Sequence, residues 1–192
     1  MSVFPNFIKK YGGPIDAVSV PAEVIDRYKD KLPESIIQFW QQEGWGGFID
    51  GLIWIINPDS VIDYIPQWMD YGGHGIPFMR TAFGDIVLWV PYVHKNRIEI
   101  IFIRYQDYNV IGDDLTHLFE KSFCNEEVLA HKLNSDNFQA ALQKLGPLKP
   151  DECYGYEPAL ALGGEENINN LKIVKYIEHL DILTQLLEKN VD

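Results

Sequence analysis

The sequence predicts an α+β fold, in which an antiparallel meander sheet is flanked by helices and a helical C-terminal part packs on the sheet. Three observations favour this class. Apolar residues recur at helical spacing before residue 45 and after residue 112, strand-sized apolar segments joined by short turns fill residues 77–105, and the C-terminal segment repeats leucine at helical spacing. The chain has 192 residues, 46% hydrophobic and 23% charged, a composition typical of a folded globular protein.

Three helices are expected before the first strand. Residues 4–11 form a short apolar-rich helix, and apolar residues at helical spacing predict a second helix over residues 21–32. Pro33 suits the first turn of a third helix, because its missing N–H would have no helical partner there. Gly44 is a favourable C-cap for that helix.

A strand from Leu52 to Ile56 follows, and residues 57–59 then begin a helix that reaches about Trp68. Turns at Gly84-Asp85 and Lys95-Asn96 separate three further strand candidates. These strands span residues 77–83, 86–91 and 98–105. Both sides of the middle strand are apolar, so we expect it to be central and covered on both faces.

Residues 113–145 predict three more helices, ended by Gly146-Pro147. They span residues 113–123, 125–132 and 135–145. An acidic aromatic turn follows at residues 151–157, and the small apolar residues from Pro158 to Leu162 predict a buried strand. After a Gly163-Gly164 break, the final helix has an inner face of leucines: Leu180, Leu183, Leu186 and Leu187.

The net charge of −12 is distributed unevenly along the chain. Residues 1–106 hold 9 basic and 12 acidic side chains, a balance of −3, whereas residues 107–192 hold 7 and 16, a balance of −9. Such a surface repels nucleic acid and attracts a basic partner. The alternative is that the charge only keeps the protein in solution.

No cluster of side chains predicts catalysis. His74 lies near Asp70 in a glycine-rich loop, but no nucleophile or second histidine accompanies this pair. The other histidines lack the spacing of a metal site, and the carboxylates beside Cys153 would raise the pKa of its thiol. We therefore expect no enzyme activity, no cofactor and no metal, and we keep an unrecognised site around His74 as an alternative class.

Candidate contact residues are aromatic and acidic side chains outside the expected apolar faces. Trp45 lies in a glycine-rich turn, Trp68 and Tyr71 lie near the glycine loop, and the acidic turn pairs tyrosines with carboxylates. Tyrosine and tryptophan often anchor protein interfaces. The candidate partner interface is Asp151, Glu152, Tyr154, Tyr156, Glu157, Trp45, Trp68 and Tyr71.

Two sequence strings carry a family resemblance. The first is LPESIIQFWQQEGWGGFIDGLIWIINP, and the second is the order of Gly-Pro stop, acidic aromatic turn, PALALGG run and final amphipathic helix. The first resembles GAD-like domains and the second the C-terminal domain of immunity proteins that neutralise DNase effectors of type VI secretion. The resemblance implies a GAD-like domain at residues 1–112 and an immunity-protein domain at residues 113–192, packed as one compact unit.

The resemblance also implies a function: binding and blocking a cognate DNase toxin, which would be basic, by protein–protein contact. No contact with nucleic acid or membrane is expected. The N-terminal segment lacks the pattern of a signal peptide, so we expect cytoplasmic residence. The front string also resembles the wider SMI1/KNR4-like proteins, and a regulatory or scaffold module with a non-toxin partner therefore stays open.

Overall fold

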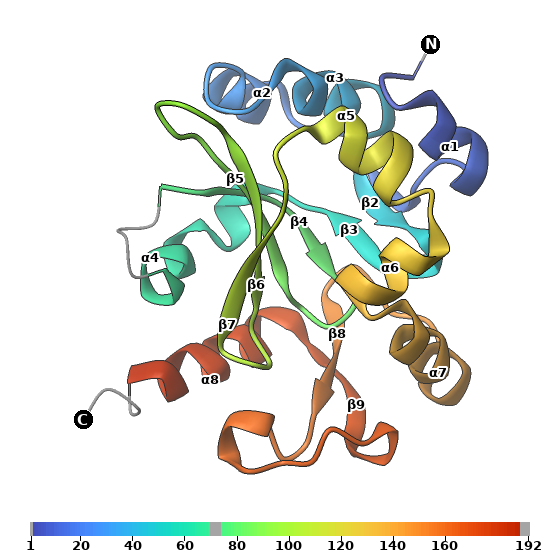
Figure 1. Cartoon of the computed structure of the whole chain (residues 1–192), viewed down its shortest axis with the longest axis vertical. Coiled ribbons are helices and arrows are strands. Elements are labelled where there is room, and N and C mark those ends of the chain that lie inside the picture. The colour runs from blue at the N-terminus through green and yellow to red at the C-terminus, as the bar shows by residue number, and fades with distance from the viewer. Residues whose placement is uncertain (1, 70–73, 189–192) are drawn as a thin grey trace.

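A seven-stranded antiparallel sheet forms the centre of the protein (Figure 1). The computed structural model describes residues 2–69 and 74–188. Each strand of the sheet pairs with its neighbours in the sequence, so the predicted meander is confirmed. The strands are β1 (Ile15–Val18), β2 (Trp45–Phe48), β3 (Ile53–Ile55), β4 (Ile76–Thr81), β5 (Ile86–Val90), β6 (Arg97–Phe102) and β7 (Asp107–Gly112).

Helices surround this sheet, and a separate hairpin of two strands lies in the C-terminal part (Figure 1). The helices are α1 (Pro5–Tyr11), α2 (Ala22–Tyr28), α3 (Glu34–Glu43), α4 (Ile65–Trp68), α5 (Leu115–His117), α6 (Glu126–Leu133), α7 (Ser135–Leu145) and α8 (Tyr176–Glu188). A π-helical turn, Leu118–Ser122, extends α5. The hairpin consists of β8 (Glu152–Tyr156) and β9 (Leu171–Lys175).

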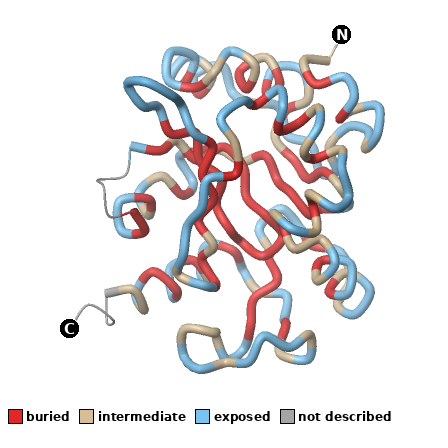
Figure 2. The backbone as a smooth tube through the Cα atoms, in the orientation of Figure 1, coloured by how far each residue is buried: buried red, intermediate tan, exposed pale blue. Residues whose placement is uncertain are grey.

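The sheet carries apolar packing on both faces, as the alternation in β5 predicts. Val87 and Trp89 belong to the larger core, which also contains residues of α1, α2, α3, α6 and α7. Ile86, Leu88 and Val90 belong to the smaller core, which also contains residues of α4 and α8. All five β5 residues are buried, and the burial is concentrated in the central strands (Figure 2).

The sequence analysis missed β1, β2 and β7. All four residues of β1 and most of β7 are exposed, so neither strand has the apolar alternation that marks a half-buried strand. β2 reads WGGF, and glycine is rare in strands. Gly47 is needed in β2 because a Cβ atom there would come within 3.1 Å of the Trp54 ring.

The segments at residues 151–157 and 158–162 differ from expectation: the first contains a strand, and the second contains none. The expected acidic turn is mostly strand β8, which pairs with β9 and whose Tyr154 N–H donates to the Ala82 carbonyl at 2.8 Å. The expected buried strand from Pro158 to Leu162 is wrong, because Leu160–Leu162 is a short 3₁₀ helix and Leu162 is 62% exposed. The hydrogen bond from Tyr154 joins the C-terminal hairpin to the β4–β5 turn.

Candidate partner-binding surface

The two tyrosines predicted as contact residues in β8 are core residues. Tyr154 is 1% and Tyr156 4% exposed. The Tyr154 ring lies 6.1 Å from the ring of Phe83 and 6.3 Å from that of Phe138, and its hydroxyl donates to the Gly146 carbonyl at 2.6 Å. Burial raises the pKa of Tyr154 to about 12. The paired strand turns both side chains into the core, where they leave little surface for a partner.

The carboxylates at the start of β8 are exposed to different degrees, and lysines compensate their charges. Lys175 Nζ lies 2.5 Å from Asp151 Oδ2 and 3.5 Å from Glu152 Oε1, and Lys149 Nζ lies 3.9 Å from Glu152. The hydrogen bond from Lys175 lowers the pKa of Asp151. Glu157, at the end of β8, is exposed and forms no ion pair within the described residues.

The two tryptophans predicted as contact residues also differ in their environments. Trp68 is 8% exposed and donates from Nε1 to Thr184 Oγ1 at 2.8 Å, so it links α4 to α8 and leaves little surface for a partner. Trp45 is half-buried in β2, with its ring edge-on to Trp40 at 5.8 Å. It lines an apolar hollow of about 320 Å³ together with Asp151. Tyr71 and Asp70 lie outside the described residues.

The C-terminal part instead presents a surface that the sequence analysis did not identify, here called the acidic face. Its carboxylates are exposed and form no ion pair within the described part of the chain. They are Glu157, Glu165, Glu166, Glu178 and Asp181. Gly155 of β8 packs against the ring of His179 in α8, which places the end of β8, and with it Glu157, beside α8.

Exposed apolar side chains accompany these carboxylates and complete the acidic face. Leu162 is 62%, Ile177 42% and Ile182 53% exposed. In α8, the pairs Ile177–Asp181 and Glu178–Ile182 are four residues apart, so each pair lies together on the helix surface. These four residues lie on the side of α8 opposite the inner leucines. Apolar and acidic residues at this spacing are the pattern from which the sequence could have predicted the face. Apolar anchors within a charged rim are typical of protein interfaces.

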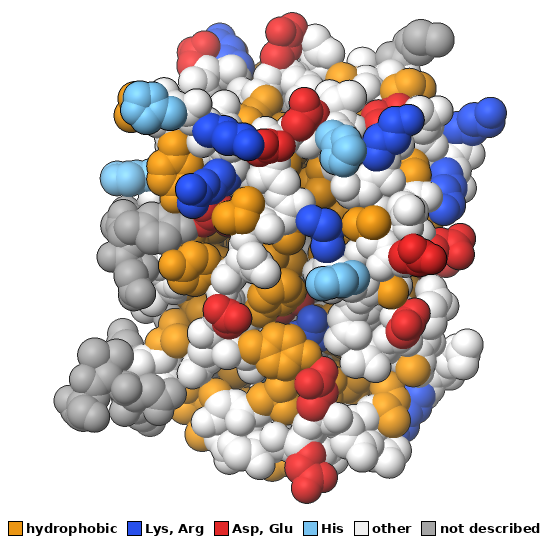
Figure 3. Space-filling view, viewed as in Figure 1, with side chains coloured by type: hydrophobic (Ala, Val, Ile, Leu, Met, Phe, Trp, Pro, Cys, Tyr) orange, Lys and Arg blue, Asp and Glu red, His pale blue; other side chains and the backbone are white. Residues whose placement is uncertain are grey.

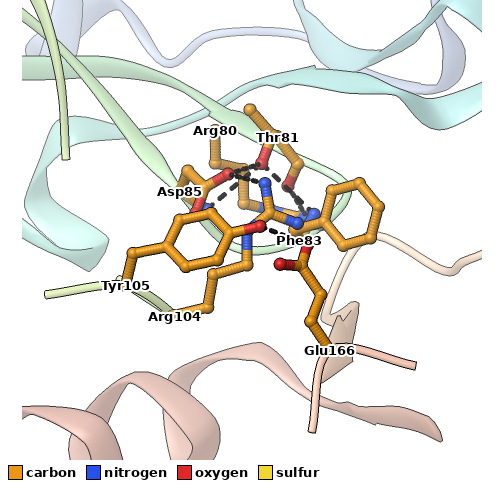
Figure 4. Close-up of polar contacts among 7 residues, drawn as sticks. All are labelled: Arg80, Thr81, Phe83, Asp85, Arg104, Tyr105 and Glu166. Atoms are coloured by element: carbon orange, nitrogen blue, oxygen red, sulfur yellow. Dashed lines mark hydrogen bonds and ion pairs between the residues drawn. The ribbon is translucent and has the colours of Figure 1, made fainter. Parts of the chain in front are cut away.

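A buried ion pair supports one end of the acidic face (Figure 4). Arg104 Nη2 lies 3.0 Å from Asp85 Oδ2, and the same oxygen accepts a hydrogen bond from Thr81 Oγ1 at 3.0 Å. Burial raises the pKa of Asp85, and the Arg104 charge opposes this shift. The residue after Arg104, Tyr105, donates from its hydroxyl to Glu166 at 2.5 Å. The sheet therefore positions the loop that carries Glu165 and Glu166.

The candidate chemical groups are not brought together. His74 is exposed, and no group of three His, Cys, Asp or Glu side chains within residues 2–69 and 74–188 is arranged to hold a metal ion. Cys153 is fully buried, and burial raises the pKa of its thiol to about 12. In the described part of the chain, none of the helices has the length and apolar character needed to cross a membrane.

Family models match two parts of the chain. Residues 2–103 match the family model of the GAD-like domain, and residues 113–187 match that of the C-terminal domain of the T6SS immunity protein Tdi1. The fold is similar to the crystal structure of Atu4351 from Agrobacterium tumefaciens. The TM-score is 0.75 at 20% sequence identity, over 95% of this chain and 88% of that one. No curated protein matches the sequence.

Proposed function

The chain belongs to the family of type VI secretion immunity proteins in which a GAD-like domain precedes a Tdi1-type C-terminal domain, and from this we propose that it binds and neutralises a cognate DNase toxin. In this proposal the protein acts by contact alone, without catalysis of its own. The toxin is met in the cytoplasm, where its DNA substrate lies.

The observation that carries the proposal is the acidic face. A DNase that binds DNA through its phosphates needs lysine and arginine side chains along its substrate channel. The acidic face offers the opposite charge, and no lysine of residues 2–69 and 74–188 forms an ion pair with its carboxylates, in contrast to Asp151 and Glu152. Opposite charges accelerate encounter, and apolar residues such as Ile177 and Ile182 supply area that becomes desolvated on binding.

Protection against a toxin requires tight and extensive binding. Nanomolar affinity corresponds to about −12 kcal/mol, and specific complexes commonly bury roughly 1,600 Å² in total. Such interfaces involve about 20–30 residues on each side, more than the acidic face contains. The half-buried Trp45 and the hollow beside it are the adjoining surface that we include in the proposed contact.

The test is binding to the toxin encoded beside this gene. We expect the purified protein to stop DNA cleavage by that toxin at a one-to-one ratio. The double variant Glu178→Lys/Asp181→Lys should associate about tenfold more slowly at low salt and depend less on salt. A matched control, Glu23→Lys/Asp30→Lys, makes the same change of net charge on and just after α2, where both residues are exposed.

Each outcome separates one part of the proposal. If both double variants slow association equally, net charge matters and the acidic face does not. If neither changes it, the interface lies elsewhere, and a binding partner without nuclease activity would remove the DNase assignment while leaving the immunity family intact. The variant Asp151→Lys/Glu152→Lys should slow association less, since its carboxylates already contact Lys175.

A further inference from the structure

Strand β7 is an end strand of the large sheet, and its outer side carries exposed groups. It pairs with β6, and no further strand of residues 2–69 and 74–188 continues the sheet beyond it. Val110 is 45% exposed, and its N–H donates to the side chain of the preceding residue, Asn109, at 2.8 Å. Figure 2 shows β7 as mostly exposed in contrast to the buried strands behind it. An edge of this kind is a template for another strand.

A hollow lies beside the same strand, between β7 and α6. Its volume is about 650 Å³, and its lining includes Phe102, Ile111, Val128 and His131. Hydrophobic side chains gather down the middle of this side of the molecule (Figure 3). Lys132 also lines the hollow and donates from Nζ to the Ile111 carbonyl at 2.7 Å, so a cation lies at one end of the edge.

We propose that β7 pairs antiparallel with β7 of a second copy of this chain, with Asn109 facing the partner's Asn109. In this register, residue numbers on opposing strands add up to a constant. Val110 therefore faces the partner's Tyr108, two side chains that are 45% and 41% exposed in one copy. Aromatic and β-branched residues form favourable cross-strand pairs.

Charge complementarity favours a second copy as the occupant. The same register sets Asp107 opposite the partner's Ile111, whose carbonyl is the one that Lys132 contacts. In the dimer, Asp107 of each copy is thus brought to Lys132 of the other, which gives two such carboxylate–lysine contacts. The direction of the backbone groups also fits, because the N–H and C=O groups of alternate residues in an antiparallel strand point to opposite edges of that strand. The N–H of Val110 points outward, away from β6. The register of β7 with β6 shifts between Val110 and Gly112, so the regular part of the proposed pairing is centred on residues 108–110.

The test is the mass of the full-length protein in solution across a dilution series, by sedimentation or light scattering. We expect a weak dimer that dissociates on dilution. Val110→Pro removes the outward N–H and leaves the bonds to β6, and proline is tolerated on edge strands. It should weaken the dimer about tenfold or more, because two symmetry-related hydrogen bonds are lost. Val110→Thr keeps the N–H and the branched side chain and should dimerise as the natural chain does.

A charge exchange provides an independent arm. Asp107→Lys and Lys132→Asp should each weaken the dimer, and the double variant should recover it. A monomer at every concentration, or a dimer insensitive to Val110→Pro, overturns the proposal. So does a monomer in which only toxin binding responds to Val110→Pro, since the edge would then receive a toxin strand. The proposal does not depend on the toxin, so its failure leaves the proposed function untouched.

Discussion

The inner and outer sides of the C-terminal part differ in what their side chains contact. On the inner side, Tyr154, Tyr176 and Leu180 are buried against the large sheet or the smaller core. On the outer side, the carboxylates of the acidic face meet no lysine within the described residues. Under the proposed function, the inner side contributes to stability and the outer side to binding, so variants of the two should have separable effects.

The largest expected effect is the loss of the whole inner side. A chain that ends at Leu145 lacks β8, β9 and α8, and it exposes the sheet face that carries Ile86, Leu88 and Ile101. Each lost leucine contact costs about 2–5 kcal/mol of a total near 5–15 kcal/mol. We expect an aggregating chain without a cooperative melting transition. A soluble fragment that melts at the full-length temperature would instead make the two parts independent domains.

The second effect isolates one contact of the inner side. Arg80 is fully buried, and its guanidinium lies between the rings of Trp54 (5.0 Å) and Tyr176 (4.8 Å). It also donates from Nη2 to the Pro150 carbonyl at 2.8 Å. Arg80→Met leaves the part-buried Pro150 carbonyl without this donor and removes both cation–π contacts, so we expect a loss of about 3 kcal/mol in the free energy of unfolding.

Urea denaturation measures this loss, and Arg80→Lys is the matched control. Lysine keeps the charge without the planar group, so its cost should fall between those of the natural residue and methionine. Toxin binding by the folded Arg80→Met protein should stay unchanged. A variant as stable as the natural chain would show that the arginine is replaceable by any side chain of its volume.

The third effect concerns the outer side. The double variant Ile177→Ser/Ile182→Ser removes two exposed apolar groups of α8, and substitutions at exposed positions commonly change stability by less than about 0.5 kcal/mol. We expect dissociation from the toxin to become about tenfold faster, as for the loss of about 1.4 kcal/mol. The control Val93→Ser alters a side chain between β5 and β6 that is 95% exposed and lies outside the proposed contact. An equal effect of this control would contradict the comparison.

The sequence predicts those elements whose own residues carry a periodic pattern. The meander from β4 to β6, helix α3 and the inner leucines Leu180 and Leu183 all follow from apolar spacing. The strands β1 and β7 carry no such pattern because they lie at the edges of the sheet, where both faces are exposed.

The site was predicted less well than the fold, for a reason specific to β8. Charged and aromatic residues in succession are typical of an exposed turn, but here the tyrosines are buried by contacts with Phe83 and Phe138, which lie far away in the sequence. Likewise, the pairing of Asp151 with Lys175 depends on the β8–β9 register, which no local pattern fixes. Glu157 is the candidate residue that belongs to both the predicted interface and the acidic face.

The smallest expected effect lies at the boundary between the two sides, at His179. Its ring packs against Gly155, where a Cβ atom would come within 2.8 Å of Cε1, and burial lowers the pKa of His179 below 6.5 while Glu157 opposes the shift. Between the lowered pKa and about 6.5 the unfolded chain binds more protons than the folded one. The contribution of His179 to stability is therefore present above about pH 6.5 and is lost as the pH falls below it.

His179→Gln should remove this dependence. The melting temperature of the natural chain should fall more than that of the variant between about pH 7.5 and about pH 5.5. Comparing the two chains cancels the pH dependence that arises from the carboxylates they share. These include Asp85, whose raised pKa changes stability with pH in the opposite direction. Parallel melting curves would mean that Glu157 fully offsets the burial of the imidazole. In that case the acidic face would itself stabilise the fold, and the separation of stability from binding would end at this residue.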